Sequence, residues 1–360
     1  MTPTYTVTVA STGAFVPFEP IGNDDLEKLC GALPADVLEG IQVQRRHWMI
    51  DPRTGEHRIS NSRMALAAVE QALERAGIEP QELELLVVCT ASPDYHLPNV
   101  ATMIQSYLGL ERCATIELRA GCAGAVQALD VAHRLLAAGM HRNAVVVGSE
   151  AISPIIAPIY LDSEPDRIRM RDRLTLFTFG DGAGAIALTA TEGEPRQTHF
   201  VNSCIGGLRS PGMQVIGGGT DISFREQRTR KKPVEMKIDV PGTSTFGPKV
   251  FAAALSDVLS STGLHVADFA HIVLPEGNAG YFNRELADAG ISESDYQLLQ
   301  GRIVENLADV GATGSAAVPL SLDAGVRSST VTDGDRILLL GIEASRYVYS
   351  GLVLDWNSAP

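Results

Sequence analysis

The sequence predicts an α/β fold composed of two similar halves, and three observations support this prediction. Helical and strand-like patterns alternate along the chain, a helix–strand unit recurs later in the chain, and a glycine-rich segment recurs at nearly the same offset. Alternating elements of this kind form sheets that are covered by helices on both faces. The 360 residues, 45% of them hydrophobic, are enough for one large core or two fused cores.

The repeated helix–strand unit begins at residue 64. Residues 64–94 read as an amphipathic helix, a glycine stop at Gly77 and a buried β-branched strand. Residues 250–280 repeat this pattern with Gly263 in the place of Gly77, at an offset of 186 positions. Because a helix, its stop signal and the following strand all recur in order, we expect this unit to be duplicated.

The glycine-rich segment is the second match. The stretch 120-AGCAGAVQ-127 aligns with 310-VGATGSAA-317 at an offset of 190, which places Cys122 on Ala312. The other elements that we expect are strands at 144–150, 184–190 and 336–343 and a helix at 125–139. The least regular segments are 153–178 and 207–234, and segments of this length are typical of lids, dimer contacts or binding loops.

Composition excludes several classes of protein. The formal net charge of −14 argues against nucleic-acid or anionic-membrane binding, which is built from clustered Lys and Arg. No signal-peptide pattern and no run of about 18 apolar residues occurs, so we expect a cytoplasmic protein that has no membrane contact. The five cysteines are scattered and show no ligand spacing, so we expect reduced thiols and no metal site.

Six short motifs occur in a fixed order: 41-IQVQRRHW-48, 86-LVVCTASPDYHLPNVATMIQSYLGL-110, 117-ELRAGCAGAVQALDVA-132, 146-VVGSEAIS-153, 179-FGDGAGAIAL-188 and 310-VGATGSAAVPLSL-322. Together they resemble the β-ketoacyl-acyl-carrier-protein synthase III group of the thiolase superfamily over almost the whole chain. The resemblance implies a five-layered α/β/α/β/α thiolase fold with two halves, residues 1–190 and 191–360. It also implies a homodimer in which a cysteine between the halves carries an acyl group.

Cys122 matches the cysteine nucleophile of that family. Its position before the predicted helix supports the match, because the positive end of the helix dipole lowers a thiol pKa and raises the thiolate fraction. The neighbouring glycines allow a thioester to approach backbone N–H groups, which stabilise a tetrahedral oxyanion. The alternative is that Cys122 is an ordinary small core residue.

The sequence departs from the family at two positions. Where relatives carry a histidine after a second-half strand, 275-PEGNA-279 has Glu276, and where they carry an asparagine, 311-GATGS-315 has Ala312. The histidine and the asparagine donate hydrogen bonds to the enolate that malonyl decarboxylation produces. An ionised Glu276 repels that enolate and Ala312 donates nothing, so ordinary malonyl condensation is disfavoured. Glu276 is suited instead to act as a general base.

Other residues near these motifs are candidate substrate contacts. Asn278 and Asn306 lie near the two altered motifs and carry donors for a carbonyl oxygen, and Ser345 belongs to a loop that is glycine-rich in relatives. We therefore expect Asn278, Asn306, Ala312 and Ser345 to be possible oxyanion or substrate contacts.

A binding region is expected at Arg45, Arg46 and Trp48, which match the part of relatives that meets the adenine and phosphates of coenzyme A. An arginine can clamp an anion, and a tryptophan can stack on a base. The basic run at residues 225–232 can steer an acidic carrier protein. For both regions the alternative is an ordinary solvated surface.

The sequence thus predicts an acyltransferase of specialised metabolism that loads Cys122 from acyl-CoA or acyl carrier protein and passes the acyl group to a small-molecule acceptor activated by Glu276. No cofactor is permanently bound, because the acyl-CoA or phosphopantetheine thioester is itself a substrate. Two alternatives stay open. One is a carbon–carbon condensing 3-oxoacyl synthase that uses Glu276 as a base without decarboxylation, and the other is an inactive partner subunit of a synthase heterodimer.

Overall fold

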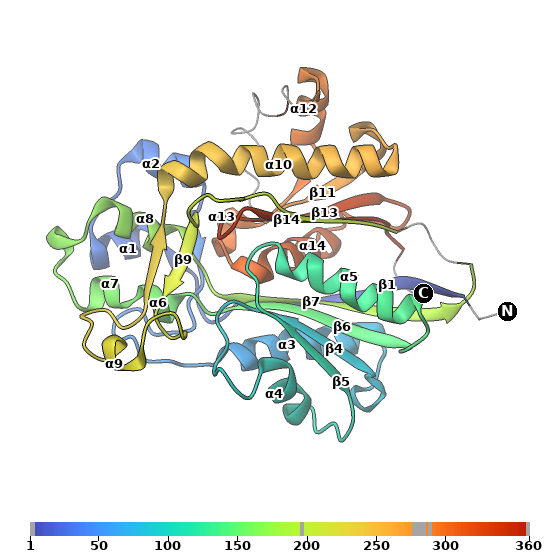
Figure 1. Ribbon diagram of the computed structural model, residues 1–360, viewed down its shortest axis with the longest axis horizontal. Helices are drawn as coiled ribbons and strands as arrows, with labels where there is room; N and C mark the ends of the chain where they lie inside the picture. The colour runs from blue at the N-terminus through green and yellow to red at the C-terminus, as the bar shows by residue number, and fades with distance from the viewer. Residues whose placement is uncertain (1–3, 195–197, 276–285, 287–289, 358–360) are drawn as a thin grey trace.

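A computed structural model describes residues 4–194, 198–275, 286 and 290–357. Figure 1 shows five layers stacked on one another: helices, a sheet, a central helical layer, a second sheet and an outer helical layer. The layers agree with the expected α/β/α/β/α order. Glu276 and Asn278 lie outside the described residues.

The first sheet has five strands, and all of them come from the first half of the chain. Their order across the sheet is β1 (Tyr5–Phe15), β7 (Gly182–Glu192), β6 (Asn143–Glu150), β4 (Leu85–Cys89) and β5 (Ala114–Leu118). The pairs β6–β4 and β4–β5 are parallel, whereas β1–β7 and β7–β6 are antiparallel. The inner strands β4 and β6 are almost fully buried, as expected for strands covered on both faces.

The second sheet repeats this topology. Its strands are β12 (Ile303–Val304), β11 (His271–Val273), β13 (Arg336–Glu343), β14 (Val348–Asp355) and β8 (His199–Cys204), in that order. Pairings β12–β11–β13 are parallel and β13–β14–β8 antiparallel, so each strand has a counterpart in the first sheet. The predicted thiolase-type fold of two duplicated halves is therefore confirmed, while the division of the chain at residue 190 stays a prediction.

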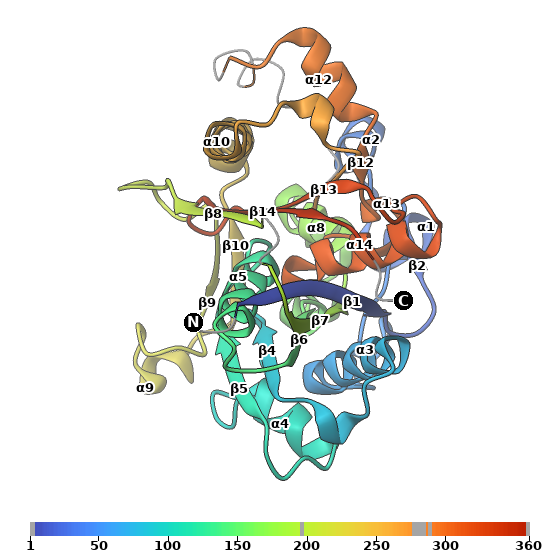
Figure 2. The same cartoon turned by 90° about the vertical axis from the view of Figure 1, so that its right-hand side faces the viewer.

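Two helices form the central layer. They are α5 (Gly124–Ala137) and α14 (Ala317–Arg327), and both contact strands of the two sheets. The outer helices are α3 (Asn61–Ala76) and α4 (Val100–Tyr107) on the first sheet, and α10 (Val240–Thr262) and α12 (Glu293–Gln300) beside the second. Figure 2 shows this stacking from the side.

The repeated helix–strand unit is visible in its stop signals. Gly77 ends α3 with φ of 65° and Gly263 ends α10 with φ of 69°, and both N–H groups donate to carbonyls of the last turn. A residue with a side chain is strained at such angles, so a glycine at the end of each helix is required by geometry. The offset of 186 positions therefore reflects a real structural repeat.

Residues 153–178, expected to be irregular, are mostly helical. They form α6 (Ser153–Ile156), α7 (Pro158–Leu161) and α8 (Met170–Thr178), which lie beside α1 (Asn23–Cys30) and α2 (Ala35–Ile41) at one end of the molecule. These helices are only four to nine residues long, too short for a clear helical period in the sequence. The short strands β2 (Ile21–Gly22) and β3 (Arg45–Arg46) pair in the same region.

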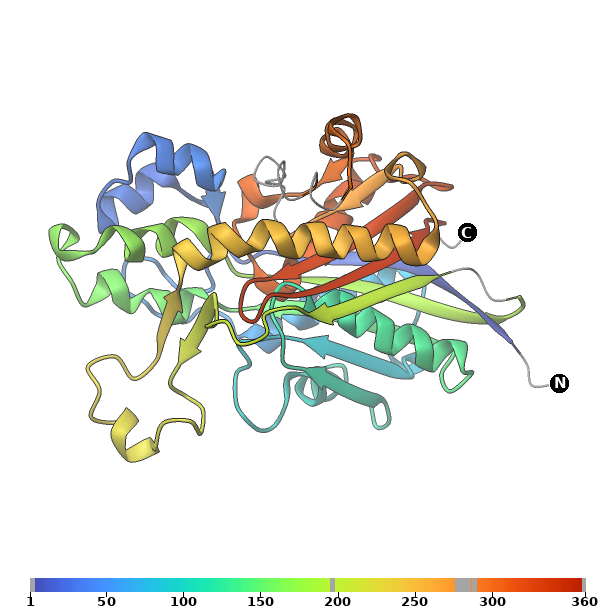
Figure 3. The same ribbon diagram turned by 45° about the horizontal axis from the view of Figure 1, so that its top comes forward.

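An arm extends from the body at the end of the molecule that also holds α6 and α7 (Figure 1). It contains β9 (Met213–Ile216), α9 (Phe224–Gln227) and β10 (Glu235–Ile238), and β9 pairs only with β10 in the described sheets. Figure 3 shows α9 at the tip of this arm, away from the layered body. The arm accounts for the second expected irregular segment, 207–234.

Candidate active site

Cys122 lies in the turn between β5 and α5, two residues before the helix begins. Its side chain is half-buried, whereas Gly121 and Ala123 beside it are buried. The 14-residue helix that follows directs the positive end of its dipole at this turn. The position predicted from the sequence for a thiol at the mouth of a helix is the position observed.

Close packing behind the turn explains its small residues. A Cβ atom added to Gly124 would lie 2.0 Å from the Cys89 Sγ atom of β4, so only glycine fits where α5 begins. The Cys89 thiol in turn donates to the Ala120 carbonyl at 3.5 Å. Burial raises the pKa of Cys89 well above its ordinary value, and the charges of nearby carboxylates add to the rise. The Cys89 thiol is therefore protonated at neutral pH, and its role is to pack against Gly124.

The second half of the chain contacts the same turn through β13. A Cβ atom added to Gly341 would lie 2.7 Å from the Ala123 Cα atom and 2.8 Å from the Cys122 carbonyl oxygen. The absence of a side chain at Gly341 thus lets the central strand of the second sheet touch the backbone of the Cys122 turn. Cys122 lies at the junction of the two halves.

A carboxylate that the sequence analysis missed lies at the end of that strand. Glu343 is the last residue of β13 and is only 7% exposed. Its Oε2 atom accepts the Gly121 N–H at 2.8 Å, and its Oε1 atom accepts the Ser345 hydroxyl. The candidate contact Ser345 is therefore linked to the nucleophile turn through Glu343. The sequence signal that could have identified Glu343 is a charged residue directly after the apolar run of β13.

Ala312, the counterpart of Cys122 in the repeat, is 3% exposed. Its N–H donates to the Thr178 carbonyl at 2.8 Å, and its own carbonyl accepts the Gly180 N–H at 3.1 Å. Since the methyl side chain has no donor and the N–H is engaged, Ala312 is not suited to stabilise an oxyanion. The contact predicted for Ala312 is not supported by this geometry.

A second buried carboxylate supports the segment that follows Ala312. Glu150, at the end of β6, is fully buried and accepts hydrogen bonds from Ser92 Oγ at 2.6 Å, Ala91 N–H at 2.8 Å and Ser315 N–H at 3.2 Å. Burial raises the pKa of Glu150, and these donors counteract the rise. Glu150 thereby joins the loop after β4 to the segment that carries Ala312.

Asn306 lies at the N-cap of α13 (Leu307–Val310) and is half-buried. Its Oδ1 atom accepts the Ser321 hydroxyl of α14 at 3.0 Å. This contact orients the amide toward α14 and gives Asn306 a structural role. Its predicted contact with substrate stays a prediction, as do the roles of Glu276 and Asn278.

The predicted coenzyme A contacts at residues 45–48 need correction. Arg46 is fully buried, and its guanidinium donates to the carbonyl oxygens of Ile21 at 2.9 Å and Phe177 at 2.7 Å. Burial lowers the pKa of Arg46 to about 10. Trp48 is 1% exposed, donates to the Phe179 carbonyl at 3.0 Å and stacks on Tyr160. Both side chains are almost fully buried, so neither is the exposed contact that was expected for coenzyme A.

Arg45 is the exposed member of this group. Its guanidinium pairs with the Asp309 carboxylate at 2.7 Å, and both side chains are more than half exposed. Arg45 is therefore exposed, unlike Arg46 and Trp48, with its guanidinium engaged by Asp309, and its contact with coenzyme A stays a prediction.

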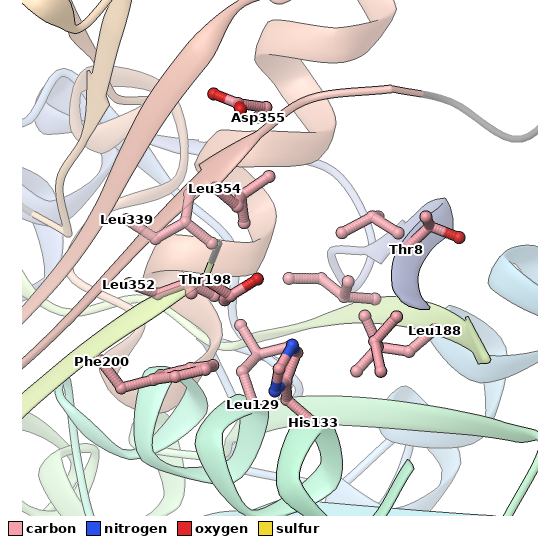
Figure 4. A pocket seen from close by; sticks show the side chains of 13 residues that line it. Thr8, Leu129, His133, Leu188, Thr198, Phe200, Leu339, Leu352, Leu354 and Asp355 are labelled. Carbon is pink, nitrogen blue, oxygen red and sulfur yellow. The ribbon is translucent and has the colours of Figure 1, made fainter. Parts of the chain in front are cut away.

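A small cavity lies along the far part of α5 (Figure 4). Its volume is about 40 Å³, and Leu129, His133, Phe200 and Leu352 are among the side chains that line it. Burial lowers the pKa of His133, so this imidazole is neutral at pH 7. Because the cavity borders the later turns of α5, it is separate from the Cys122 turn.

In the described part of the chain, no three His, Cys, Asp or Glu side chains gather as a metal site would require. No helix among the described residues has both the length and the apolar character needed to cross a membrane.

Comparison with known proteins identifies matching family models. The model described as 3-Oxoacyl-[acyl-carrier-protein (ACP)] synthase III matches residues 116–206, and the model of its C-terminal part matches residues 259–356. The two matches cover more than half of the chain, and they include the Cys122 turn and the segment around Ala312.

Individual relatives match over nearly the whole length. A β-ketoacyl-[acyl-carrier-protein] synthase III of Neisseria meningitidis is 28% identical over 339 residues, covering 93% of this chain and 94% of that protein. Among solved structures, AbyA1, described as a tetronic acid condensing enzyme, is 26% identical with a TM-score of 0.80, covering 97% of this chain and 100% of that one. The synthase III of Pseudomonas aeruginosa PAO1 is 25% identical with a TM-score of 0.78, covering 99% and 100%.

The contact between β13 and the nucleophile turn is testable with Gly341→Ala. The added methyl group must displace the Cys122 and Ala123 backbone, so we expect a loss of about 1–3 kcal/mol in the free energy of unfolding. Urea unfolding measures this loss. Gly219→Ala is the matched control, because a Cβ atom there meets nothing within 4 Å and we expect a change below about 0.5 kcal/mol. Equal stability of the two variants would contradict the close approach.

The burial of Arg46 is tested by comparing it with its exposed neighbour, Arg45. Arg46→Ala leaves buried carbonyls without their donor, and we expect it to lower the free energy of unfolding by about 3 kcal/mol. Arg45→Ala removes an exposed ion pair, so its expected loss is below about 1 kcal/mol. Urea unfolding of both variants and the wild type measures these losses. Similar losses of unfolding free energy in the two variants would refute the assignment of Arg46 to the core.

Proposed function

The chain belongs to the 3-oxoacyl-[acyl-carrier-protein] synthase III family, and from that premise we propose that it is an acyltransferase with Cys122 as its nucleophile. The enzyme is of the ketoacyl synthase III type. The proposal concerns its acyl acceptor: the protein transfers the acyl group to a small molecule and does not condense it with a decarboxylating malonyl thioester.

One observation carries this proposal. Ala312 occupies the place where the resemblance implies an asparagine, and its buried methyl group and engaged N–H offer no hydrogen bond to an enolate. Decarboxylation of a malonyl thioester needs such donors, because negative charge develops on the carbonyl oxygen. Loss of that donor, while the turn around Cys122 is preserved, favours acyl transfer without decarboxylation.

The first step loads the enzyme. The Cys122 sulfur attacks the carbonyl carbon of an acyl thioester, and its proton passes to a base. The bond to the coenzyme A or phosphopantetheine sulfur breaks, and that thiol leaves with a proton. Backbone N–H groups at the start of α5 can donate to the tetrahedral oxyanion that this attack produces.

The second step releases the acyl group. An acceptor hydroxyl or amine loses its proton to Glu276 as it attacks the acyl carbonyl, and Cys122 leaves as the thiolate and is reprotonated. Glu276 fits this role because a carboxylate acts as a general base when burial moves its pKa toward neutrality. The acyl thioester is the substrate, and neither step requires a permanently bound cofactor.

Positive charge on the arm is an argument for a carrier protein as the acyl donor. Arg225, Arg228 and Lys231 are exposed on and after α9, which projects from the body of an otherwise acidic protein (Figure 3). Positive side chains on a projecting segment attract an acidic partner and speed its association. Coenzyme A thioesters remain the other donor class.

The edge of the first sheet supports a homodimer. Strand β5 is the outermost strand of that sheet, and all five of its residues are only partly buried, whereas those of the adjacent β4 are buried. An exposed edge strand presents backbone groups that can pair with a second copy of the chain. A dimer joined at β5 would cover this edge.

A second function is favoured by the similarity to AbyA1, whose description is a tetronic acid condensing enzyme. In that reaction class Glu276 would remove a proton from an activated carbon, and the carbanion would attack the acyl group on Cys122. The acceptor then forms a carbon–carbon bond, and no carbon dioxide is released.

Loading of Cys122 is measured by intact-protein mass spectrometry after incubation with acyl-CoA and acyl-carrier thioesters. We expect an acyl adduct on the wild-type protein and none on Cys122→Ala, because the thiol is the attacking group. No carbon dioxide is expected from malonyl thioesters. If no thioester labels the wild type, the transferase proposal fails and the inactive-partner alternative gains support.

The role of Glu276 is tested with Glu276→Gln. The variant should form the Cys122 adduct but discharge it to an acceptor at least about 100-fold more slowly, because the general base is lost. Single-turnover measurement of adduct decay separates the two steps. The control is Glu293→Gln on the exposed face of α12, which should behave as the wild type. Unchanged discharge in Glu276→Gln would exclude this glutamate as the base.

A further inference from the structure

Glu343 is a buried carboxylate that no assigned step uses. It ends β13 at 7% exposure, and both of its oxygens accept hydrogen bonds, from the Gly121 N–H and from the Ser345 hydroxyl. Gly121 directly precedes Cys122. A carboxylate of the second half is thus bonded to the backbone of the nucleophile turn in the first half.

The contact is close along the whole side chain. A Cβ atom added to Gly121 would lie 3.4 Å from both Cδ and Oε2 of Glu343, which is ordinary van der Waals contact. Nearby on the same strand, Gly341 meets the Cys122 carbonyl oxygen and the Ala123 Cα atom. These two residues of β13 therefore hold the turn at three consecutive residues, from Gly121 to Ala123.

The position of the carboxylate also has an electrostatic consequence. A negative charge at the amino end of a helix is stabilised by the helix dipole, and it offsets the positive potential that would otherwise favour a thiolate. The charge of Glu343 acts on the buried Cys89 thiol, whose pKa is raised by burial first and by Glu150, Glu343 and Glu117 in addition. Cys89 packs against Gly124, only two residues from Cys122.

We propose that Glu343 is a positioning residue for Cys122, which fixes the nucleophile turn and, through its negative charge, keeps Cys122 a neutral thiol before substrate binds. The proposal rests on the proposed role of Cys122 as nucleophile. The helix dipole favours the Cys122 thiolate, whereas the negative charge of Glu343 disfavours it. A base must therefore take the thiol proton while the sulfur attacks.

Other charged or titratable groups lie around the turn. Among the described residues they are Glu150 of β6, Glu117 of β5, Cys89 of β4, the exposed Arg119 on the turn itself and the exposed Arg346 after β13. Glu150 and Glu117 are engaged by backbone N–H groups of other segments, and the Arg346 guanidinium donates to the carbonyls of Gly207 and Arg209. Glu343 is the one among these carboxylates that bonds to the turn.

The test is the pH dependence of Cys122 alkylation by iodoacetamide, followed on the Cys122 peptide by mass spectrometry from about pH 6 to about pH 10. Glu343→Gln keeps an oxygen acceptor for the Gly121 N–H and an amide donor for Ser345, but removes the charge. We expect its midpoint to fall by about one pH unit, which gives roughly tenfold faster alkylation at pH 7. An unchanged midpoint would overturn the electrostatic role.

Glu343→Asp is the second variant, because it keeps the charge and shortens the reach by one methylene group. Its midpoint should stay within about 0.3 pH unit of the wild type, while its plateau rate at high pH should change by about threefold or more as the turn loses its fixed position. Glu343→Gln should keep the wild-type plateau. If the Asp and Gln variants share one plateau, or if both shift the midpoint equally, the proposed positioning role is wrong.

The exposed Cys204 on β8 is an internal control, since its peptide should show the same profile in every variant. Alkylation needs no acyl donor, so this experiment is independent of the proposed function. Failure of every thioester to label Cys122 would refute the transferase proposal. The alkylation profiles would still show whether Glu343 positions Cys122 and controls its ionisation.

Discussion

The close approach of β13 to the turn before α5 is the contact on which the candidate site depends. The Gly121 N–H meets the Glu343 carboxylate at 2.8 Å, and Gly341 leaves room for the Cys122 backbone. Neither half of the chain builds this site alone, because Cys122 and the strand that supports its turn come from different halves. A small residue and a buried carboxylate two positions apart on one strand thus fix the geometry of the thiol.

Duplication explains both the symmetry of the fold and the asymmetry of its chemistry. The two sheets share one strand order, and Cys122 and Ala312 occupy matching places before α5 and α14. One copy is half-buried and carries a thiol, while the other is buried and engages its backbone with Thr178 and Gly180. The same turn therefore presents a half-buried thiol in one half and a buried methyl group in the other.

Buried charges stabilise the segments around this junction. Glu150 joins the loop after β4 to the segment around Ser315, and Arg46 joins β3 to the Phe177 carbonyl at the end of α8. Each charge makes several hydrogen bonds, which offset part of the cost of its removal from water. Arg46 was expected at a coenzyme A site because its segment matches that part of the family, and burial of a side chain cannot be read from such a match.

The sequence by itself determined the α/β architecture, its internal repeat and the place of Cys122, because helix periods, glycine stops and the order of motifs are local properties of the chain. It did not reveal the contact of Glu343 with the Cys122 turn, since Glu343 lies 222 positions from Gly121, whose N–H donates to its carboxylate. It also did not separate the exposed Arg45 from the buried Arg46. Burial and contacts between distant segments arise only when the two sheets pack, so the environment of Cys122 was decided by the tertiary structure.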